Sequence, residues 1–497
     1  MTRRVRKSPA PTMGRFLALV LCAVFALGAG QARALTPEGA YGAAVAVAKA
    51  KASDQVLFLT PSGSDSNDCR AIGSACGTLD HALTLAANAG GAVIHISGGT
   101  FNLGTVGMPS NTSLQGAGMG VTVLKIPNSA CRSGLINSDT TNGNNHLSLA
   151  DLTIDGNKAN QCGQAAAHVS DTLDGSVFGI EWHKVRQWQL TNVEAQNVDG
   201  KGIYIIGDAV TSPASYSYSL LNVYAHDNAL DGVHVGAAMR EGQWTNVRGF
   251  ANGRDGLWLD VSQAQINGVY AYGNTRNGIW IRNTFSSSYW NMEADKNGNY
   301  GIKVTGAVNC NGGNWQAHDN GQHTAGLADV WFDQTNTYSY GITNQTQIFG
   351  IEAGPVASGS PWIEGNEPAT PTEAYGLNVD PGITGDVAIL NVHIPNGGLS
   401  GAISVANAGS TGNLLLTDKP GGTANFRVLR GAMKMLAGGI YPSNGAGAAG
   451  AGIWSGSGAP TGVTGAASGD VYFRTDTPGT ANQRIYIYNG STWTGIL

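Results

Sequence analysis

Histidine, tyrosine, tryptophan and charged residues recur at fixed distances from regularly spaced glycines in the middle of the sequence. Two places after the glycines stand Glu181, Tyr204, His234, Trp258, Trp280 and Lys303. Four places after them stand His183, Ile206, Gly236, Asp260, Arg282 and Thr305. Just before them stand Lys201, Asp231, Asp255, Asn277 and Tyr300. A merely solvated face would more often carry Thr, Ser, Asn and Lys, so these positions are candidates for chemistry.

These side chains suit an acidic sugar chain. His183, His234 and Tyr204, with Glu181 beside them, can supply the base and the acid that abstract a proton alpha to a uronate carboxylate. Cations neutralise that carboxylate and make the proton more acidic, and flat indole rings can support pyranose rings. The predicted substrate-binding residues are Trp258, Trp280, Asp260, Arg282, Lys201, Lys303, Asp231 and Asp255.

Structural alternatives exist for several of these residues. Asp231 and Asp255 can cap turns. Glu181 and His183 can form a local ion pair. Outward tryptophans can cover neighbouring parts of the same chain or an associated chain, and a surface His234 can have no chemical role.

The elements that position these residues form a repeat. Its segments start at Asn192, Asn222, Asn246, Gly268, Asn291 and Asn314, and from the second onward they are 22 to 24 residues apart. A period of this length with strand-like alternation and Gly/Asn turns is typical of a β-solenoid, whose coils bury their apolar sides by stacking. The sequence predicts an all-β, single-stranded right-handed parallel β-helix.

A second column of asparagines supports the register of the coils. Six residues after five of the starts stand Asn228, Asn252, Asn274, Asn297 and Asn320. Stacked Asn side chains can hydrogen-bond along the axis, and Asn tolerates a left-handed turn conformation. We expect these five residues to lie in one line.

Strand alternation then predicts where the candidate residues point. The apolar residue after each glycine must face inward, so the residues two and four places after the glycine face outward on one sheet. We expect them to share one solvent-open groove, with Trp258 and Trp280 along its floor.

The sequence also suggests five regions. Residues 1–34 have the charged, apolar and small-residue parts of a signal peptide, so the mature chain is expected to be secreted or periplasmic, of bacterial type. Residues 35–110, with helices at 39–52 and 78–89 and a strand at 92–96, would cap the β-helix of residues 111–410. A Gly/Ala/Ser-rich connector covers 411–455, and residues 456–497 form a small β module with strands at 470–474 and 484–488.

Composition limits the partners. The chain has 497 residues, 12 % charged residues and a formal net charge of −5, which argues against nucleic acid and anionic membranes. Cys69 with Cys76 can close a short loop, Cys131 with Cys162 is a weaker pairing, and Cys310 is left over. No metal-ligand spacing is present, so no metal or cofactor is expected, although calcium is left open.

Three segments carry a resemblance to a known family: 116–120 (GAGMG), 151–157 (DLTIDGN) and 225–232 (AHDNALDG). They resemble the catalytic β-helix modules of secreted mannuronan epimerases and alginate lyases, and residues 55–410 resemble the pectate-lyase-like superfamily more broadly. The resemblance implies an acidic polysaccharide as partner. It departs at the site: the family's Asp-Pro-His-Glu motif is replaced by Ile203, Tyr204, Ile205 and Ile206, and a further family Asp falls at Gly236.

The C-terminal region has a resemblance of its own. The segments 474–478 (RTDTP) and 483–488 (QRIYIY) are similar to the small C-terminal module of phage tail and fibre proteins. This similarity implies assembly or attachment, including a homo-oligomer formed through the module.

Three functions follow from these patterns. The preferred one is a lyase or epimerase acting on a uronate polysaccharide. The second is a glycoside hydrolase that uses two of Glu181, Asp231, Asp255 and Asp260. The third is a non-catalytic, tailspike-like glycan-binding or structural protein.

Overall fold

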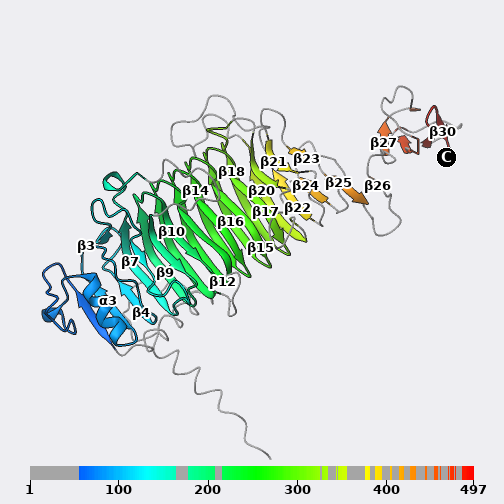
Figure 1. The fold of residues 1–497 in the computed structure, drawn as a ribbon. Coiled ribbons are helices and arrows are strands. Elements are labelled where there is room, and N and C mark those ends of the chain that lie inside the picture. Colours follow the sequence, from blue (N-terminus) through cyan, green and yellow to red (C-terminus); the bar gives the residue numbers. More distant parts are fainter. Residues whose placement is uncertain are drawn as a thin grey trace, which may run out of the picture. The chain divides into compact units, whose positions relative to one another are not determined.

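The chain folds into a right-handed parallel β-helix, as the repeat predicts (Figure 1). The computed structural model describes residues 55–163, 177–207, 215–324, 327–333, 343, 345–354, 375–380 and 387–393, and short segments between 403 and 496. The expected signal peptide and the helix expected at 39–52 lie outside these residues. Among the described helices, none combines the length and the apolar character that a membrane span requires.

One parallel sheet, here called the first sheet, follows the repeat glycines. Its strands in the central coils are β8 (Phe178–His183), β10 (Lys201–Ile206), the start of β12 (Val233–Phe250), β13 (Leu257–Ser262), β15 (Ile279–Phe285), β17 (Ile302–Val308), β19 (Ala328–Asp333) and β21 (Tyr375–Val379). Each pairs with the strand one coil away. The apolar residue after each glycine is buried, as in Ile203, Val233 and Leu257, and each such side chain contributes about 1.5–3 kcal/mol to stability.

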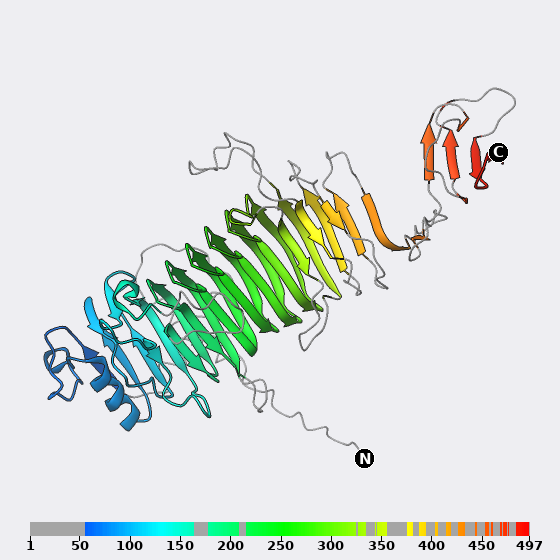
Figure 2. The ribbon, with the colours of Figure 1, turned by 45° about the horizontal axis from the view of Figure 1, so that its top comes forward.

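The other strands are longer and bend in the middle. They are β7 (Leu147–Asp155), β9 (Trp188–Gln196), β11 (Tyr216–His226), the end of β12, β14 (Gln265–Tyr272), β16 (Ser288–Asp295), β18 (Asn311–His318), β20 (Thr346–Ala353) and β22 (Val387–His393). In β9, β11 and β12 the bend is an asparagine with φ of 51–52°, a left-handed conformation that Asn tolerates. Figure 2 shows the successive coils from a second direction.

The predicted asparagine line is confirmed. The side-chain amide of Asn228 donates to Oδ1 of Asn252 at 3.0 Å, and the series continues through Asn274, Asn297 and Asn320 at 2.9–3.0 Å. All five residues are buried. The left-handed residues are not these asparagines but others, among them the bend asparagines, so that part of the expectation is wrong.

The ladder also explains the repeat glycines. A Cβ on Gly256 would lie 2.6 Å from the amide nitrogen of Asn274, and a Cβ on Gly278 would lie 2.6 Å from that of Asn297. Because contacts this short are not tolerated, each glycine admits the asparagine of the next coil.

The N-terminal part matches the sequence prediction in its elements. Helix α3 (Leu79–Asn88) begins after Thr78, whose hydroxyl accepts from the backbone N–H of His81, and leads into β2 (Ala92–Ile96). Parallel pairing already begins at β1 (Val56–Leu59), which pairs with β2. The remaining early strands are β3 (Gly99–Asn102), β4 (Thr112–Gln115), β5 (Thr122–Lys125) and β6 (Leu135–Ile136).

The C-terminal part contains two groups of strands. Parallel pairing continues through β23 (Ile403–Val405) and β24 (Leu414–Asp418), and β25 (Phe426–Ala432) and β26 (Ser443–Asn444) follow in antiparallel pairs. A separate small sheet contains β27 (Ile453–Gly456), β28 (Val471–Arg474), β29 (Ile485–Tyr488) and β30 (Trp493–Gly495). The two strands expected at 470–474 and 484–488 are therefore present.

Candidate functional site

The first sheet brings the predicted column into register. Pairing places Glu181 beside Tyr204, Tyr204 beside His234, and His234 beside Trp258. The column then runs through Trp280 and Lys303 and continues to Trp331 and Asn378, which the sequence analysis missed. The apolar alternation of β19 is the signal that could have found Trp331.

The expected solvent-open floor is wrong. Trp258 is 1 % exposed and Trp280 is 3 % exposed, and Tyr204 and His234 are also buried. The rings stack along the column: the centroids of His234 and Trp258 lie 4.3 Å apart, and those of Trp258 and Trp280 lie 4.6 Å apart. The middle of the column is therefore a packed ladder, while Glu181 at one end and Lys303, Trp331 and Asn378 at the other are partly exposed.

A buried polar cluster surrounds His234. The Lys201 ammonium lies 2.9 Å from Nδ1 of His234, and a carboxylate oxygen of Asp231 lies 3.5 Å from the same nitrogen and 3.7 Å from the ammonium. A lysine ammonium has no acceptor, so Nδ1 accepts its hydrogen bond and the imidazole hydrogen resides on Nε2. Lys201 thus fixes one neutral tautomer of His234.

The two turn aspartates are bound by arginines. Arg254 pairs with Asp231, and Arg276 pairs with Asp255, each through two guanidinium nitrogens. Burial alone raises the pKa of Asp231, but the hydrogen bonds from Arg254 and the charges of Arg254 and Lys201 hold this pKa well below its usual range. Both carboxylates are buried. Their proposed contact with substrate therefore has no support from their surroundings.

The Glu181 end of the column contains a carboxylate–histidine pair. Oε1 of Glu181 lies 2.8 Å from Nε2 of His183, and its Oε2 accepts from the hydroxyl of Ser133. Burial raises the pKa of Glu181, but these two hydrogen bonds outweigh it and lower the pKa below its ordinary value. The pair is partly exposed, so it remains open to a ligand.

Tyr204 lies between the two histidines. Its ring meets His183 and His234 edge-on at centroid distances of 6.0 and 5.1 Å. The Lys201 ammonium lies 4.2 Å from the centre of the tyrosine ring, close enough for a cation–π contact. A candidate base (His183), a candidate acid (Tyr204) and a cation (Lys201) thus lie in neighbouring coils.

Asp260 and Arg282 lie on the outward side of the next coils. Burial raises the pKa of Asp260 to about 6, although the charge of Arg282 and a hydrogen bond from Asn283 lower it. The Arg282 guanidinium carbon lies 5.0 Å from the ring centre of Trp258. A Cβ on Gly236 would lie 3.1 Å from Cβ of Asp260 and 3.2 Å from Nε2 of His234, so both residues border the backbone of Gly236.

Lys303 is engaged within the protein. Its ammonium lies 4.5 Å from the ring of Trp280, 4.6 Å from that of Trp331 and 3.4 Å from a carboxylate oxygen of Asp333. These contacts fix the ammonium between two rings, in the part of the column remote from Glu181.

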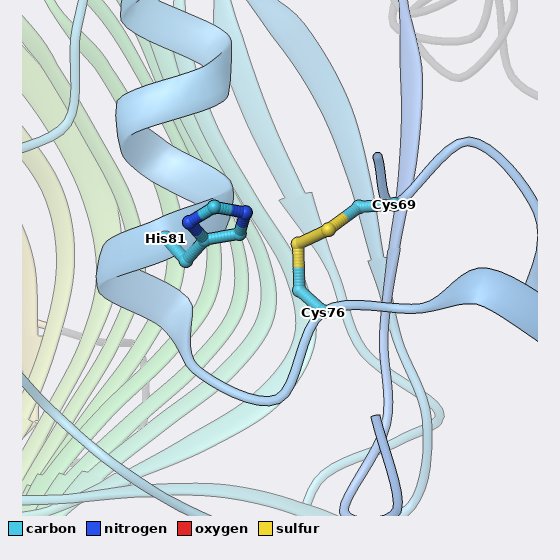
Figure 3. A group of neighbouring side chains, drawn as sticks. All are labelled: Cys69, Cys76 and His81. Carbon is cyan, nitrogen blue, oxygen red and sulfur yellow. A yellow bond between two sulfur atoms is a disulfide. The ribbon is translucent and has the colours of Figure 1, made fainter. Parts of the chain in front are cut away.

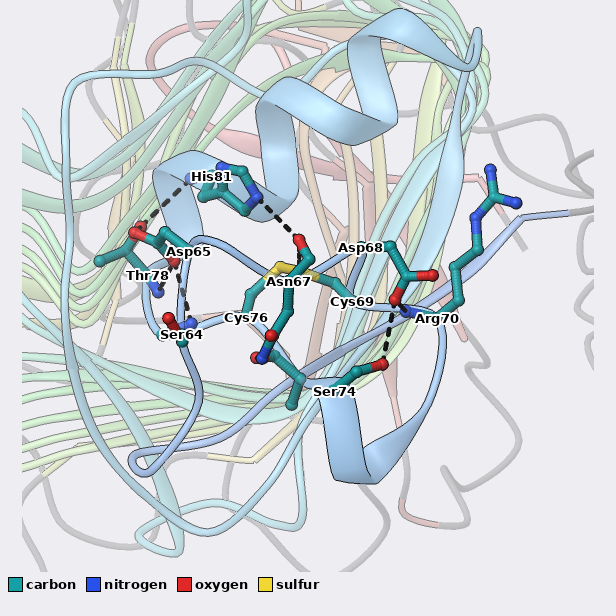
Figure 4. Close-up of a disulfide and its surroundings, with 12 residues drawn as sticks. Ser64, Asp65, Asn67, Asp68, Cys69, Arg70, Ser74, Cys76, Thr78 and His81 are labelled. Atoms are coloured by element: carbon teal, nitrogen blue, oxygen red, sulfur yellow. Dashed lines mark hydrogen bonds between the residues drawn. A yellow bond between two sulfur atoms is a disulfide. The ribbon is translucent and has the colours of Figure 1, made fainter.

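One group of possible metal ligands lies elsewhere, near the N-terminal helix. Cys69, Cys76 and His81 lie close together (Figure 3). The two cysteines form the expected disulfide, and Nε2 of His81 lies 3.3 Å from the carbonyl oxygen of Asn67 (Figure 4). The sulfurs are therefore not thiolate ligands. The weaker pairing, Cys131 with Cys162, also forms, and Cys310 is a buried free thiol.

The chain is similar to known polysaccharide-modifying proteins in sequence. No protein-family profile matches it. It is 27 % identical over 199 residues to mannuronan C5-epimerase AlgE6 of Azotobacter vinelandii and 25 % identical over 190 residues to AlgE4 of the same organism. Over these matched stretches the chain is homologous to the two mannuronan C5-epimerases. The matched parts cover 37 and 36 % of this chain, but only 21 and 32 % of the two epimerases.

The fold agrees with this homology. The A-module of epimerase AlgE6 superimposes with a TM-score of 0.50 and 20 % identity, over 68 % of this chain and 94 % of the module. At this identity the likeness establishes the β-helix fold.

Proposed function

We propose that the protein is a lyase or epimerase for a uronate-containing polysaccharide and acts on it at the Glu181 end of the first sheet. The observation that carries the proposal is the set of His183, Tyr204 and His234 in three adjacent coils, with Glu181 and Lys201 beside them. The homology to enzymes named for C5 epimerisation of mannuronan supports the same class of substrate.

The proposed reaction begins with removal of the proton on the carbon alpha to the uronate carboxylate. His183, oriented by Glu181, is placed to act as the base, because its ring is partly exposed and hydrogen-bonded to a carboxylate. We assign to Tyr204, in the coil next to His183, the exchange of the second proton, on the opposite face of the sugar ring. Return of a proton to the opposite face completes epimerisation, whereas breakage of the glycosidic C–O bond at the neighbouring carbon, with protonation of the leaving oxygen, completes elimination.

The arrangement disfavours hydrolysis by the turn carboxylates. Asp231 and Asp255 are buried and bound to Arg254 and Arg276. A general acid in a glycosidase must reach the glycosidic oxygen, and its pKa is raised rather than lowered. The lowered pKa of Asp231 is the reverse of this requirement.

Two assays test the proposal on alginate, pectate and other polyuronates. Ultraviolet absorbance from a new C=C bond reports elimination, and exchange of the alpha proton with deuterated water reports epimerisation. We expect His183→Ala or Tyr204→Phe to lower turnover by about 10²-fold or more with the fold intact. His323→Ala and Tyr224→Phe, which lie off the first sheet, are the matched controls. Unchanged turnover in both test variants would exclude this end of the sheet.

His234 needs a separate measurement, because its contacts with Lys201 and Asp231 suit a positioning role. Lys201 would influence the reaction through the tautomer of His234 that it fixes. In that case His234→Ala should lower kcat with little change in KM. Reducing ends without absorbance or proton exchange would indicate a hydrolase, and binding without any turnover would indicate a glycan-binding protein.

A further inference from the structure

A second set of aromatic side chains lies on the bent strands, after the bend and away from the first sheet. The rings of His226, Phe250 and Tyr272 come from three successive coils and stack with centroid distances of 4.5 and 4.8 Å. Their planes differ by 11° and 4°. Tyr272, at the end of this stack, is 46 % exposed, so the protein presents a rigid aromatic ring to solvent.

A pocket of about 300 Å³ opens beside this ring. It is lined by Tyr272 and Tyr270, by Arg248, and by Glu293 and Asp295 of the next coil. The Arg248 guanidinium carbon lies 5.3 Å from the ring centre of Tyr224 and 5.1 Å from that of Tyr270, and its Nε donates to Oδ1 of Asn246 at 3.2 Å. The guanidinium is thus held between two rings, in a fixed position at the pocket.

The two carboxyl groups of the pocket, those of Glu293 and Asp295, are hydrogen-bonded to each other. Burial, and then the charge of Asp295 and the hydrogen bond to it, raise the pKa of Glu293 above its ordinary value. A hydrogen-bonded carboxyl pair offers both a donor and acceptors. The pair is too close for glycoside hydrolysis, which needs carboxyl groups about 5 Å or more apart. These groups therefore suit binding rather than bond cleavage.

We propose that this pocket is a second glycan-binding site, which holds an uncharged pyranose unit against the ring of Tyr272. A flat exposed ring matches the apolar face of a pyranose, and fixed polar groups around it match the sugar hydroxyls. The Arg248 guanidinium already acts on the charge of Glu293 and lies between two rings, so no lining residue of the pocket offers an unopposed cation to a uronate carboxylate, and the two sites differ in the sugars they accept. The inference does not rest on the proposed reaction, because no residue of the pocket belongs to the first sheet.

Native gels that contain a neutral polysaccharide test this site on the full chain. The probes are galactomannan and hydroxyethyl cellulose, with alginate as the charged comparison. We expect at least one neutral polymer to slow the protein. Tyr272→Ala and Glu293→Gln should each weaken that retardation about tenfold or more, as expected for loss of a buried aromatic contact or of a paired polar group. Phe349→Ala, another exposed aromatic on a bent strand, should behave as the unsubstituted protein.

The outcomes separate the two sites. His183→Ala should keep its retardation by the neutral polymer, and Tyr272→Ala should keep its activity on polyuronates. Equal migration with and without both neutral polymers overturns the inference. So does retardation that survives in both pocket variants, or that Phe349→Ala loses to the same degree.

Discussion

Trp258 on the first sheet and Tyr272 on the bent strands both point outward from the same coils, yet one is 1 % exposed and the other 46 %. Trp258 stacks between His234 and Trp280, and the guanidinium groups of neighbouring arginines lie over its ring at 5.0–5.8 Å. Tyr272 stacks on Phe250, while its partner on the next coil is Asp295, which has no ring. An outward direction therefore does not by itself give an accessible side chain.

The turns explain this difference. Asp231 and Asp255 hold Arg254 and Arg276 in place beside the first sheet, and the cations cover the indole rings. The aromatic column with its arginines is thus part of the packed structure, while the open ring and pocket lie on a face where the sequence suggested no chemistry.

The largest expected effect compares the two rings directly. Trp258→Ala should destabilise the protein by about 3–5 kcal/mol, because it leaves a cavity in a packed stack. Tyr272→Ala should cost about 1 kcal/mol or less, because nearly half of that side chain is already in water. Urea unfolding of the two variants measures the difference. Equal costs would mean that the column is as loosely packed as the exposed face.

Urea unfolding can also test the buried charges beside the first sheet. Asp231→Asn removes the carboxylate that Arg254 and Lys201 share, and takes from two buried cations this opposite charge. We expect a loss of about 3 kcal/mol in the free energy of unfolding. Asp227→Asn, four residues away with a half-exposed side chain, is the control and should cost about 0.5 kcal/mol. An unchanged free energy of unfolding in Asp231→Asn would contradict the idea that the aspartates hold the arginines over the tryptophan rings.

The sequence predicted where the candidate residues lie along the coils better than it predicted their burial and their partners. The asparagine ladder, the column from Glu181 to Lys303 and helix α3 follow from spacing and alternation, which the backbone geometry dictates. The burial of Trp258 and the arginine partners of Asp231 and Asp255 depend on side chains one coil away and in the turns. The repeat sets no fixed type at those positions, so spacing could not reveal them. The pocket at Tyr272 was missed for the same reason.

The pH dependence of stability tests the burial of Asp260 on the first sheet. The pKa of Asp260 is raised from 3.8 to about 6, so the folded protein binds this proton more tightly than the unfolded chain does. The resulting stabilisation is present below pH 4 and is lost as the pH rises to about 6. We expect Asp260→Asn to remove about 3 kcal/mol of this dependence. Unfolding curves between pH 4 and pH 7 check it, and an unchanged slope in the variant would contradict the assigned environment.

The smallest expected effect concerns two asparagine ladders: the buried one from Asn228 to Asn320, and an exposed one at the bends, in which the amide of Asn314 donates to Asn291 and that of Asn291 donates to Asn267. Asn297→Ala should cost about 1–2 kcal/mol, because it removes one buried hydrogen bond from the amide of Asn274 and one from Oδ1 of Asn320. Asn291, at a bend, has φ of 54° and an exposed hydrogen bond to Asn267.

Asn291→Gly relieves the left-handed conformation while losing that bond and the one that Oδ1 of Asn291 accepts from Asn314. Gly268 already occupies the equivalent bend one coil away with φ of 66°. The two effects oppose each other, so the net change should stay within about 0.5 kcal/mol. Thermal unfolding of the two variants side by side measures the contrast. If Asn291→Gly were as costly as Asn297→Ala, the exposed ladder would stabilise the coils as much as the buried one. Burial would then not distinguish the two ladders in the way that it distinguishes Trp258 from Tyr272.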